Sequence, residues 1–379
     1  MHIALNGWFW DRLDTGSGQY LRQLVPALRR AEPSLILTLI LPAHITPPDD
    51  LPDGVQVLTA GQGGRASRWG KVWFEQRTFP RLAARSGADL AHVPYWGPPL
   101  SSKLPLVVSV LDIIPVLYPE YAMGVFNRLY LSLVSTATQG ARHIITLSHT
   151  SAIDIERYLD IPSKRITATY LAPDQRFHPQ VGSDHDAEVR RRYDLPPEFV
   201  LYLGGFDRRK QVSELLEAYT FIARAEGTQI PLVIAGREPK WRQPLFPNLR
   251  RIADELGISD LVRWIGYVDE EDKPALYRLA SVFVYPSMYE GFGMQPLEAM
   301  SSGTPVVAWE AIHADEILGD GAYLVDNARS MAGAILALLL QKPFRDAMVN
   351  QGRACASQYS WRKTARETLS AYEKTLTRI

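Results

Sequence analysis

Short apolar runs alternate with longer amphipathic stretches along most of the chain. The apolar runs are rich in aliphatic and β-branched residues, as buried strands are, and the stretches between them repeat apolar residues at helical spacing. Continuous apolar strands separated by helices indicate parallel sheets covered on both faces, and therefore an α/β architecture with right-handed crossovers. The expected strands are residues 2–6, 36–41, 90–93, 106–111, 143–147, 200–204, 232–235, 262–265, 282–285 and 305–309, and the helical patterns include 20–30, 124–140, 151–159 and 212–225.

The alternation lapses between about residues 172 and 197, where the sequence is polar and interrupted by proline. A stretch of this kind between two α/β runs is typical of a domain boundary. We therefore expect two doubly wound domains, residues 1–178 and residues 190–360, that face each other across a cleft. Open α/β sheets bind ligands at the carboxyl ends of their strands, so the chemistry is expected in the strand-to-helix loops.

Composition and charge exclude several classes of protein. The 379 residues carry 41 Lys+Arg and 41 Asp+Glu, and this balance argues against a nucleic-acid-binding protein because no global positive field attracts phosphate backbones. The single cysteine, Cys355, excludes a disulfide framework and a cysteine-based zinc site, and it fits a reducing compartment. The chain starts without a signal-peptide pattern, and no apolar stretch approaches the length of a membrane span. We expect a soluble, cytoplasmic protein.

The most informative segment follows the expected strand at 282–285. A helix is expected to begin near Met294, directly after a loop that contains Gly291 and Gly293. Glycines let the backbone come close to a ligand, and the N–H groups at the start of a helix offer a site for a phosphate. The segment therefore predicts a phosphate site.

Two carboxylates, Glu290 and Glu298, flank this predicted phosphate site. A carboxylate accepts hydrogen bonds from sugar hydroxyls, so the pair fits a ligand that carries sugar-like groups on either side of a diphosphate. The alternative is that Glu298 caps or salt-bridges its own helix and that Glu290 lies at the loop surface. Spacing alone leaves both interpretations open.

A second candidate loop follows the expected strand at 200–204. Its turn contains Gly205 and leads to Arg209 and Lys210 before an amphipathic helix. Basic side chains directly after a strand suit a diphosphate leaving group. The alternative is a solvated turn that precedes the helix.

The segment Glu290-Gly-Phe-Gly-Met-Gln-Pro-Leu-Glu298, followed by Ala-Met-Ser-Ser-Gly-Thr-Pro-Val-Val, resembles the Glu-x7-Glu signature of retaining glycosyltransferases of family 4. Those enzymes have the GT-B fold, in which two Rossmann-like domains face each other and the C-terminal one holds most of the nucleotide-sugar donor. The resemblance implies that Glu298 binds the ribose hydroxyls, that Glu290 contacts the donor sugar, and that backbone amides meet the diphosphate. The amides implied are those of Gly291, Phe292, Gly293 and Met294. The usual Leu-Pro after Phe-Gly reads Met294-Gln295 here.

The loop that contains Arg209 and Lys210 resembles the family's Gly-x-x-x-x-Arg-Lys loop. The resemblance implies that these two side chains neutralise the departing nucleoside diphosphate and are catalytic. Gly205 would lie beside the donor, at a position where some relatives carry an additional arginine.

Two further strand ends agree with the resemblance, although each taken alone is an ordinary strand-to-helix turn. Gly236 and Arg237 follow the strand at 232–235, on the side where the family binds the base. Val268 follows the strand at 262–265, where family members hold the nucleobase through backbone groups.

The N-terminal half contributes a glycine-rich loop, Asp14-Thr-Gly16-Ser-Gly18-Gln-Tyr20. As a dinucleotide fingerprint it is incomplete, because position 21 is leucine. It resembles the Gly-x-Gly-x-Tyr segment of family 4, which implies that Gly16 and Gly18 reach toward the donor phosphate.

A second N-terminal element, Val-Leu111-Asp112-Ile-Ile, resembles the family's His-Asp-Leu element, with Leu111 in place of the usual histidine. The family's histidine contact therefore cannot be assigned to this chain. Asp112 is a candidate for orienting the acceptor, and the alternative is that it caps the following turn. Nearby, His92 and Tyr95 either face the acceptor side or are structural.

Residues 65–85 combine six basic residues and one acidic residue with Trp69, Trp73 and Phe74. A basic, aromatic amphipathic stretch can lie on an anionic membrane surface, as a peripheral contact, or meet an acidic acceptor. The alternative is a helix that packs its aromatic side chains inward and leaves its arginines in water.

The resemblance as a whole implies a retaining glycosyltransferase that moves a sugar from a nucleotide sugar to a hydroxyl of a glycan or lipid-linked acceptor. The best match is to bacterial mannosyltransferases of polysaccharide assembly, so GDP-mannose is the expected donor. Residues 361–379 resemble the family's closing helix, which returns to the N-terminal domain. No D-x-D motif stands at a strand end, so neither a metal nor another cofactor is expected. The alternatives are a GT-B sugar-nucleotide epimerase and a non-catalytic, two-lobed sugar- or nucleotide-binding protein.

Overall fold

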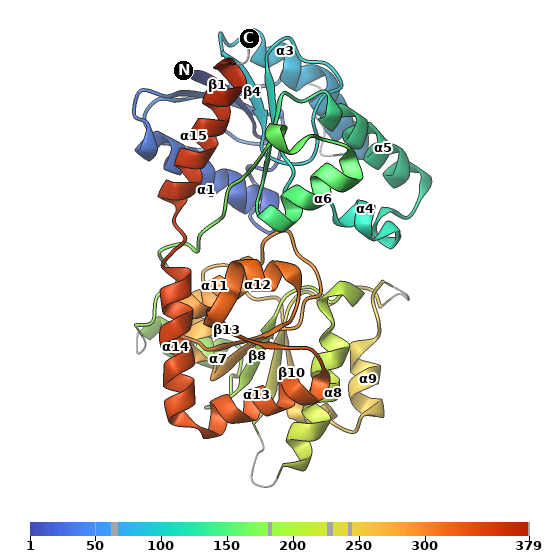
Figure 1. Cartoon of the computed structure of the whole chain (residues 1–379), viewed down its shortest axis with the longest axis vertical. Coiled ribbons are helices and arrows are strands. Elements are labelled where there is room, and N and C mark those ends of the chain that lie inside the picture. The colour runs from blue at the N-terminus through green and yellow to red at the C-terminus, as the bar shows by residue number, and fades with distance from the viewer. Residues whose placement is uncertain (50, 62–66, 181–183, 226–229, 242–244, 378–379) are drawn as a thin grey trace. The chain divides into compact units, whose positions relative to one another are not determined.

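The structure is a computed structural model that describes residues 1–49, 51–61, 67–180, 184–225, 230–241 and 245–377. The chain forms two compact units (Figure 1). The first consists of Met1–Leu171 together with Ser360–Ile379, and the second of Ala172–Tyr359. Each unit has its own parallel sheet.

The sheet of the first unit has the strand order β3-β2-β1-β4-β5-β6-β7, and each neighbouring pair is parallel. Parallel neighbours need long crossovers, most of which contain helices. The strands are β1 (His2–Asn6), β2 (Ile36–Leu41), β3 (Val55–Thr59), β4 (Leu90–Val93), β5 (Leu106–Ser109), β6 (His143–Thr146) and β7 (Ile166–Ala168). The helices are α1 (Gly16–Ala31), α2 (Arg68–Trp73), the π-helix η1 (Phe74–Thr78), α3 (Phe79–Ala83), α4 (Ile114–Leu117), η2 (Pro119–Ala122), α5 (Val125–Gln139), α6 (His149–Leu159), η3 (Ser163–Arg165) and, from the end of the chain, α15 (Trp361–Thr377).

The sheet of the second unit has the order β10-β9-β8-β11-β12-β13, again with parallel neighbours. Its strands are β8 (Val200–Leu203), β9 (Leu232–Ala235), β10 (Val262–Gly266), β11 (Val282–Tyr285), β12 (Val306–Trp309) and β13 (Ala322–Val325). Its helices are α7 (Asp184–Arg192), η4 (Arg208–Lys210), α8 (Val212–Arg224), α9 (Leu249–Glu255), η5 (Ser259–Leu261), α10 (Lys273–Leu279), α11 (Met294–Ser301), α12 (Ile312–Leu318), η6 (Gly319–Gly321), α13 (Ala328–Leu340) and α14 (Lys342–Ala356).

The central strands of the second unit are buried on both faces. Every residue of β8 and β11 is buried. On one face of the sheet, Val200 and Val284 pack in a core with α8 and α13. On the other face, Phe283 contacts Tyr277 of α10. Burial on both faces explains why these strands read as unbroken apolar runs in the sequence. The two units confirm the predicted α/β fold class with two doubly wound domains.

Three strands of the structure, β3, β7 and β13, were not predicted. β3 is an edge strand with a mostly half-exposed or exposed surface, and β7 is three residues long and half-buried. β13 is also an edge strand, and it exposes Tyr323. Edge positions need no continuous apolar run, and so the hydrophobic pattern does not reveal them.

The polar stretch at 172–197 contains helix α7, which lies in the second unit and packs against α10. Asp186 forms a buried ion pair with Arg278, at 2.5 Å between Oδ1 and Nη2. Arg192 and Tyr193 both donate to Asp272, at 2.7 and 2.8 Å. Because ion pairs and hydrogen bonds hold this helix, its sequence lacks an apolar helical pattern.

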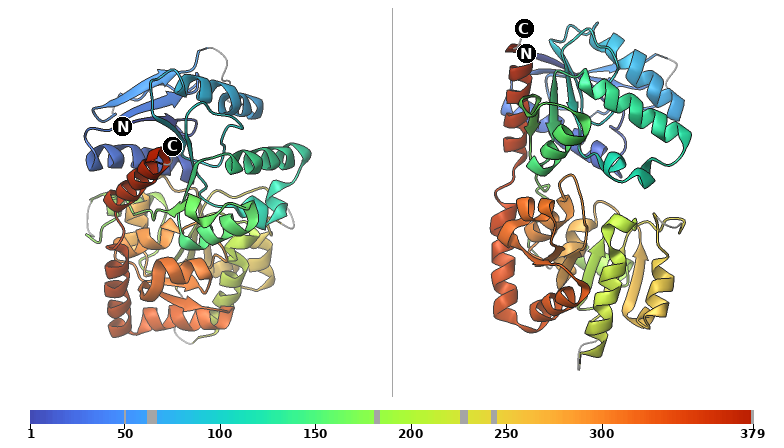
Figure 2. Two further views of the ribbon diagram at one scale, coloured as in Figure 1. Left: turned by 45° about the horizontal axis from the view of Figure 1, so that its top comes forward. Right: turned by 45° about the vertical axis from the view of Figure 1, so that its right-hand side comes forward.

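The C-terminal helix α15 packs against α1 in the first unit (Figures 1 and 2). The buried Tyr372 hydroxyl of α15 lies 2.7 Å from Nδ1 of His92, and Nε2 of His92 lies 2.8 Å from Oγ of Ser109. Burial lowers the pKa of His92 to about 3. His92 is therefore a neutral core residue that ties α15 to the sheet, which agrees with the structural interpretation.

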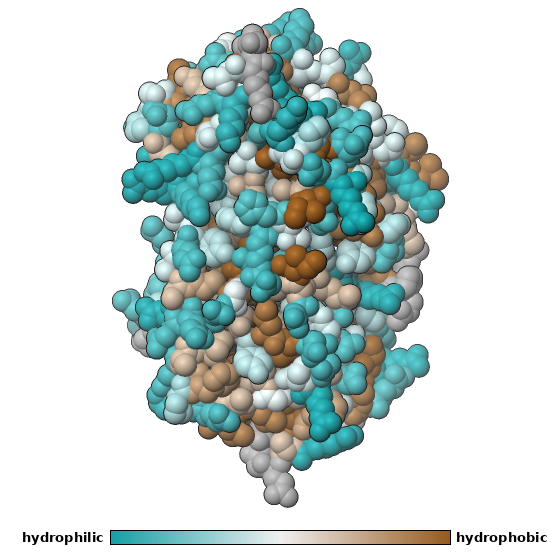
Figure 3. Space-filling model, in the orientation of Figure 1, coloured by the Kyte–Doolittle hydropathy of each residue, from teal (hydrophilic) through white to brown (hydrophobic). Residues whose placement is uncertain are grey.

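None of the described helices combines the length and the hydrophobicity that a transmembrane span requires. On the face seen in Figure 3, polar side chains alternate with small separate patches of apolar ones.

Replacing Tyr372 by phenylalanine is expected to lower the free energy of unfolding by about 1–3 kcal/mol, because it leaves Nδ1 of the buried His92 without its partner. Urea unfolding followed by circular dichroism measures the change. The matched control is Tyr219→Phe in α8, since that buried hydroxyl has no hydrogen-bond partner among the described residues. Equal losses in both variants would contradict the role given to the His92–Tyr372 hydrogen bond.

Candidate functional site

The candidate site in the second unit lies where the strand order of the sheet reverses. β8 pairs with β9 on one side and with β11 on the other, and so the chain crosses over in opposite directions from this point. Open α/β sheets bind ligands at such a point, outside the carboxyl ends of the strands. The loops that follow β8 and β11 are the two loops predicted from the sequence.

Backbone and side-chain hydrogen bonds join these two loops. The amide of Met288 donates to the carbonyl of Arg209 at 2.9 Å, and Nη1 of Arg209 donates to the carbonyl of Tyr289 at 2.5 Å. Gln211 ends η4 in a left-handed conformation, with φ of 44°, and α8 begins directly after it. The loop after β8 is thereby held against the loop after β11.

The carboxylate of Glu290 is the centre of the candidate site. Its Oε1 atom accepts hydrogen bonds from Ser287 Oγ at 2.7 Å and from Lys210 Nζ, and it forms an ion pair with Arg209 Nη1 at 2.5 Å. The side chains of Arg209, Lys210 and Glu290 are 9%, 13% and 15% exposed, so these are ion pairs of a nearly buried site and not of the open surface. Arg209 Nε also lies 3.5 Å from Oδ1 of Asp207.

The electrostatics of the cluster keep Glu290 ionised. Burial would raise the pKa of this carboxyl group, but Lys210 and Arg209 outweigh burial and lower the pKa to about 2. The positive charges of Arg209 and Lys210 are therefore balanced by the negative charges of Glu290 and Asp207. The alternative interpretation, in which Glu290 lies at the loop surface, is wrong.

The loop after β11 leads into α11 with the geometry that a phosphate site needs. Gly293 is the N-cap of α11 and has φ of 89°, a conformation that side chains other than glycine rarely adopt. A Cβ atom at Gly293 would lie 3.0 Å from the hydroxyl of Tyr285. Phe292 is buried and packs edge-on against Tyr359 at 5.8 Å between ring centroids. Backbone N–H groups in the first turn of a helix have no acceptor within the helix, and here that turn begins at Met294.

Glu298 lies one to two turns into α11 and is half-buried. Its Oε2 atom accepts from the hydroxyl of Tyr277 in α10 at 3.0 Å. Burial raises its pKa, and the charge of Lys273 opposes that rise. The alternative interpretation requires Glu298 to cap its own helix or to form an ion pair within it. The hydrogen bond goes instead to a different helix, α10.

The other predicted residues of this unit lie at the neighbouring strand ends. Gly236 follows β9, and its amide donates to the carbonyl of Gly266 at the end of β10 at 2.7 Å. Arg237 is exposed, with its guanidinium 4.9 Å from the ring centroid of Tyr267. Val268 is buried. Gly205 is exposed in the turn after β8.

Gly16, Gly18 and Asp112 belong to the first unit. Gly18 lies in the first turn of α1, where its amide donates to Oγ1 of the N-cap residue Thr15 at 3.2 Å. A Cβ atom at Gly18 would collide with the carbonyl of Arg12, whereas Gly16 faces open space. Oδ1 of Asp112 accepts from the amide of Ile114 at 3.0 Å, which is the turn-capping contact of the alternative interpretation.

Sequence reasoning missed Ser287 and Asp207, which complete the hydrogen bonds and charges around Glu290 and Arg209. Both residues stand in the two predicted loops, but no spacing rule marks them. The described residues contain no group of three or more His, Cys, Asp or Glu side chains placed to hold a metal ion.

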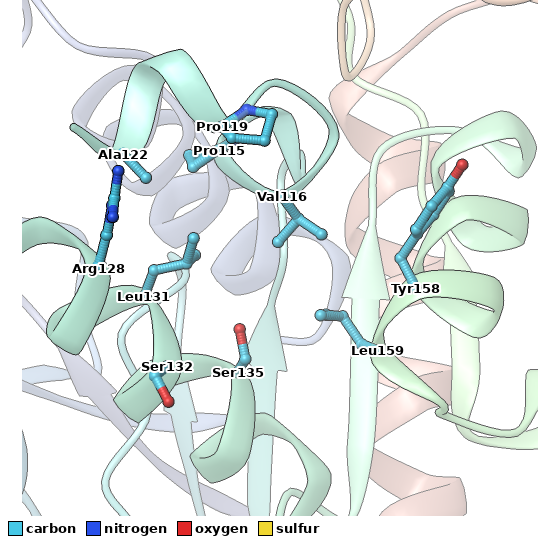
Figure 4. A pocket seen from close by; sticks show the side chains of 10 residues that line it. All are labelled: Pro115, Val116, Pro119, Ala122, Arg128, Leu131, Ser132, Ser135, Tyr158 and Leu159. Carbon is cyan, nitrogen blue, oxygen red and sulfur yellow. The ribbon is translucent and has the colours of Figure 1, made fainter.

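The first unit contains a separate cavity of about 430 Å³. Figure 4 shows that its lining is mostly apolar, with Arg128 and two serines of α5 at one side and Tyr158 of α6 at the other. The lining residues are Pro115, Val116, Pro119, Ala122, Arg128, Leu131, Ser132, Ser135, Tyr158 and Leu159.

Comparison with known proteins agrees with this fold. Residues 186–354 match the family model of glycosyl transferases group 1, and residues 15–174 match that of glycosyltransferase family 4. The O-antigen chain mannosyltransferase B of Escherichia coli is 31% identical over 300 residues, which cover 78% of this chain and 77% of that protein. The serotype-specific mannosyltransferase WbdA of Escherichia coli is 27% identical over 70% of this chain, and the match spans 33% of that longer protein.

Solved structures show the same fold at low sequence identity. Sucrose-phosphate synthase from Thermosynechococcus elongatus superposes with a TM-score of 0.74 at 22% identity, and the match covers 100% of both chains. Anabaena HepE, solved in complex with UDP-glucose, superposes with a TM-score of 0.70 at 17% identity over 98% of this chain and 100% of that one. Fold and matches together define a glycosyltransferase with the GT-B fold. The chain belongs to the glycosyltransferases of family 4, and its C-terminal half matches the model of glycosyl transferases group 1.

Replacing Gly236 by alanine is expected to destabilise the second unit by more than about 1 kcal/mol, since φ is 153° and the new Cβ atom would collide with the carbonyl of Gly204. Gly205→Ala is the matched control, because the nearest atom to its Cβ would be Oδ2 of Asp207 at 3.4 Å. Thermal unfolding measures both changes. A fully stable Gly236→Ala variant would show that the loops after β8 and β9 are not in close contact.

Proposed function

We propose that this glycosyltransferase moves a mannosyl unit from GDP-mannose to a hydroxyl of a glycan or lipid-linked acceptor, with retention of the anomeric configuration. The observation that supports the chemistry best is the pair of cations, Arg209 and Lys210, fixed by Glu290 at the point where the sheet order reverses. The choice of mannose rests on the mannosyltransferases to which the chain is similar.

In the proposed donor site, the loop after β8 and the start of α11 both bind the leaving diphosphate. Negative charge develops on the leaving diphosphate in the transition state, and fixed cations stabilise it most when they are held in place before the reaction. Arg209 and Lys210 meet this requirement because Glu290 and the carbonyl of Tyr289 hold them. The N–H groups at the start of α11 would bind the same diphosphate.

The two glutamates and the neighbouring strand ends are proposed to bind the remainder of the donor. Glu290 would accept a hydrogen bond from the sugar, and Glu298 would accept hydrogen bonds from the ribose. Gly236, Arg237 and the backbone at Val268 would face the base. Gly16 and Gly18 of the first unit would approach the donor phosphate, and Asp112 would orient the acceptor.

The proposed reaction is a front-face displacement in which the acceptor hydroxyl bonds to the anomeric carbon as the bond to the diphosphate breaks. The acceptor proton passes to the leaving phosphate. The charges needed at the diphosphate are supplied by Arg209, Lys210 and helix α11, and we propose that no metal or other cofactor takes part.

Lys210→Ala is expected to lower kcat by about 100-fold or more, because the ammonium group is needed most in the transition state. The loss of stability is expected to be the smaller effect, because Glu290 keeps its contacts with Arg209 and Ser287. Release of GDP from GDP-mannose measures turnover. Arg208→Ala, which removes the exposed neighbouring cation, is the matched control and should keep wild-type turnover. Wild-type turnover in Lys210→Ala would overturn the assignment. Parallel assays with UDP- and ADP-sugars test the choice of donor.

We further propose that the first unit makes a peripheral contact with an anionic membrane, as a cytoplasmic protein at the inner face. The structure describes residues 67–85 of the stretch 65–85, and the aromatic side chains there differ in burial. Phe74 is buried, but Trp69 and Trp73 are 74% and 59% exposed. The alternative of inward-facing aromatic side chains therefore holds for Phe74 and fails for the two tryptophans.

Helix α5 extends this exposed apolar surface. Trp69 packs edge-on against Phe126 of α5, with 5.3 Å between the ring centroids. Val125 and Leu129 of α5 are 76% and 66% exposed. The guanidinium of Arg68 lies 5.8 Å from the ring centroid of Phe126. Exposed tryptophans beside arginines are typical of a surface that inserts at the level of lipid headgroups. The cavity beside α5 in Figure 4 would then lie near lipid-linked acceptors.

Trp69→Ala combined with Trp73→Ala is expected to weaken binding to vesicles that contain phosphatidylglycerol by about tenfold or more, since both side chains would bury apolar surface in the bilayer. Co-sedimentation with vesicles measures binding. Leu340→Ala, which removes another exposed apolar side chain in the second unit, is the control. Equal vesicle binding by the wild-type chain and the double variant would contradict the membrane proposal without affecting the transferase.

A further inference from the structure

A buried histidine adjoins the Glu290 cluster and has no part in the reaction proposed above. His313 lies in the first turn of α12, which follows β12, the strand that pairs with β11. Its ring centroid lies 6.2 Å from that of Tyr289, the residue directly before Glu290. The charges of Glu290, Lys210 and Arg209 all act on this imidazole.

The imidazole of His313 has an unused hydrogen-bonding atom. The residue is 2% exposed, and Nε2 has no hydrogen-bond partner among the described residues. Burial lowers the pKa of His313 to about 4, so the ring is neutral at neutral pH and offers one N–H donor and one acceptor. A buried polar atom without a partner is unfavourable for folding, and its retention beside a ligand site indicates a ligand partner.

We propose that His313 recognises the transferred sugar, with Nε2 as the partner of a sugar hydroxyl that lies beside Glu290. This inference rests on the proposed function and names a further residue of its donor site. A hydroxyl both donates and accepts, so it matches either tautomer of a neutral imidazole, whereas phosphate oxygens match the cations Arg209 and Lys210. A hexose whose hydroxyl points elsewhere would leave Nε2 unpaired. His313 is therefore a specificity residue for the sugar and not for the diphosphate.

His313→Phe tests the proposal because it replaces the ring by an apolar one of similar shape. Isothermal titration of wild type and variant with GDP and with GDP-mannose gives two dissociation constants for each protein. The Kd for GDP is expected to stay unchanged, and the Kd for GDP-mannose to rise about tenfold or more. The melting temperature is expected to stay equal or rise, because the variant removes an unpaired buried polar group.

Two further variants complete the experiment. His313→Gln keeps a hydrogen-bonding amide and is expected to recover part of the affinity for GDP-mannose. Tyr219→Phe removes another buried polar group without a partner among the described residues, on α8, and is expected to leave both dissociation constants unchanged.

The possible outcomes separate this inference from the function on which it rests. Equal weakening of GDP and GDP-mannose by His313→Phe, a lower melting temperature in both His313 variants, or an unchanged Kd for GDP-mannose would each overturn the role in sugar recognition. A wild-type chain that binds neither GDP nor GDP-mannose would overturn the proposed donor, and with it the ligand assigned to His313.

Discussion

The ion pairs of Glu290 with Arg209 and Lys210 hold the second unit's site together. One carboxylate oxygen accepts hydrogen bonds from Lys210 and Ser287 and forms an ion pair with Arg209, and this joins the loop after β8 to the loop after β11. Burial alone would raise the pKa of Glu290, yet the cations lower it to about 2. A nearly buried cation without a carboxylate partner strongly destabilises the folded state. The folded chain therefore needs Glu290 to pair with these cations even before a ligand binds. The same arrangement keeps two cations in place for a diphosphate.

The order of the strands brings these residues together. Arg209 and Glu290 are separated by about 80 residues in the chain. They come close together because β8 and β11 are neighbours in the sheet and both residues follow the carboxyl ends of these strands. The glycines at these strand ends allow the close contacts. Gly236 is needed where its loop meets the carbonyl of Gly204, and Gly293 is needed at the left-handed start of α11.

Much of the fold could be predicted from the sequence, because strands buried on both faces are written as apolar runs. The edge strands β3 and β13 could not, since they need no such run. The two loops of the site were predicted from glycine and charge patterns, and their roles from the resemblance to a family. The contact of Arg209 with Glu290 depends on strand order, which no local pattern contains. The difference between buried Phe74 and exposed Trp73 depends on which side of the helix packs against the unit, because consecutive residues of a helix point in different directions.

A crystal structure of the chain with bound GDP would show whether this cation pair is the diphosphate site. We expect the β-phosphate between the loops after β8 and β11, within hydrogen-bonding distance of Lys210 Nζ and of the backbone amides at the start of α11. A diphosphate bound at another edge of the sheet, with Lys210 still paired only with Glu290, would contradict this expectation.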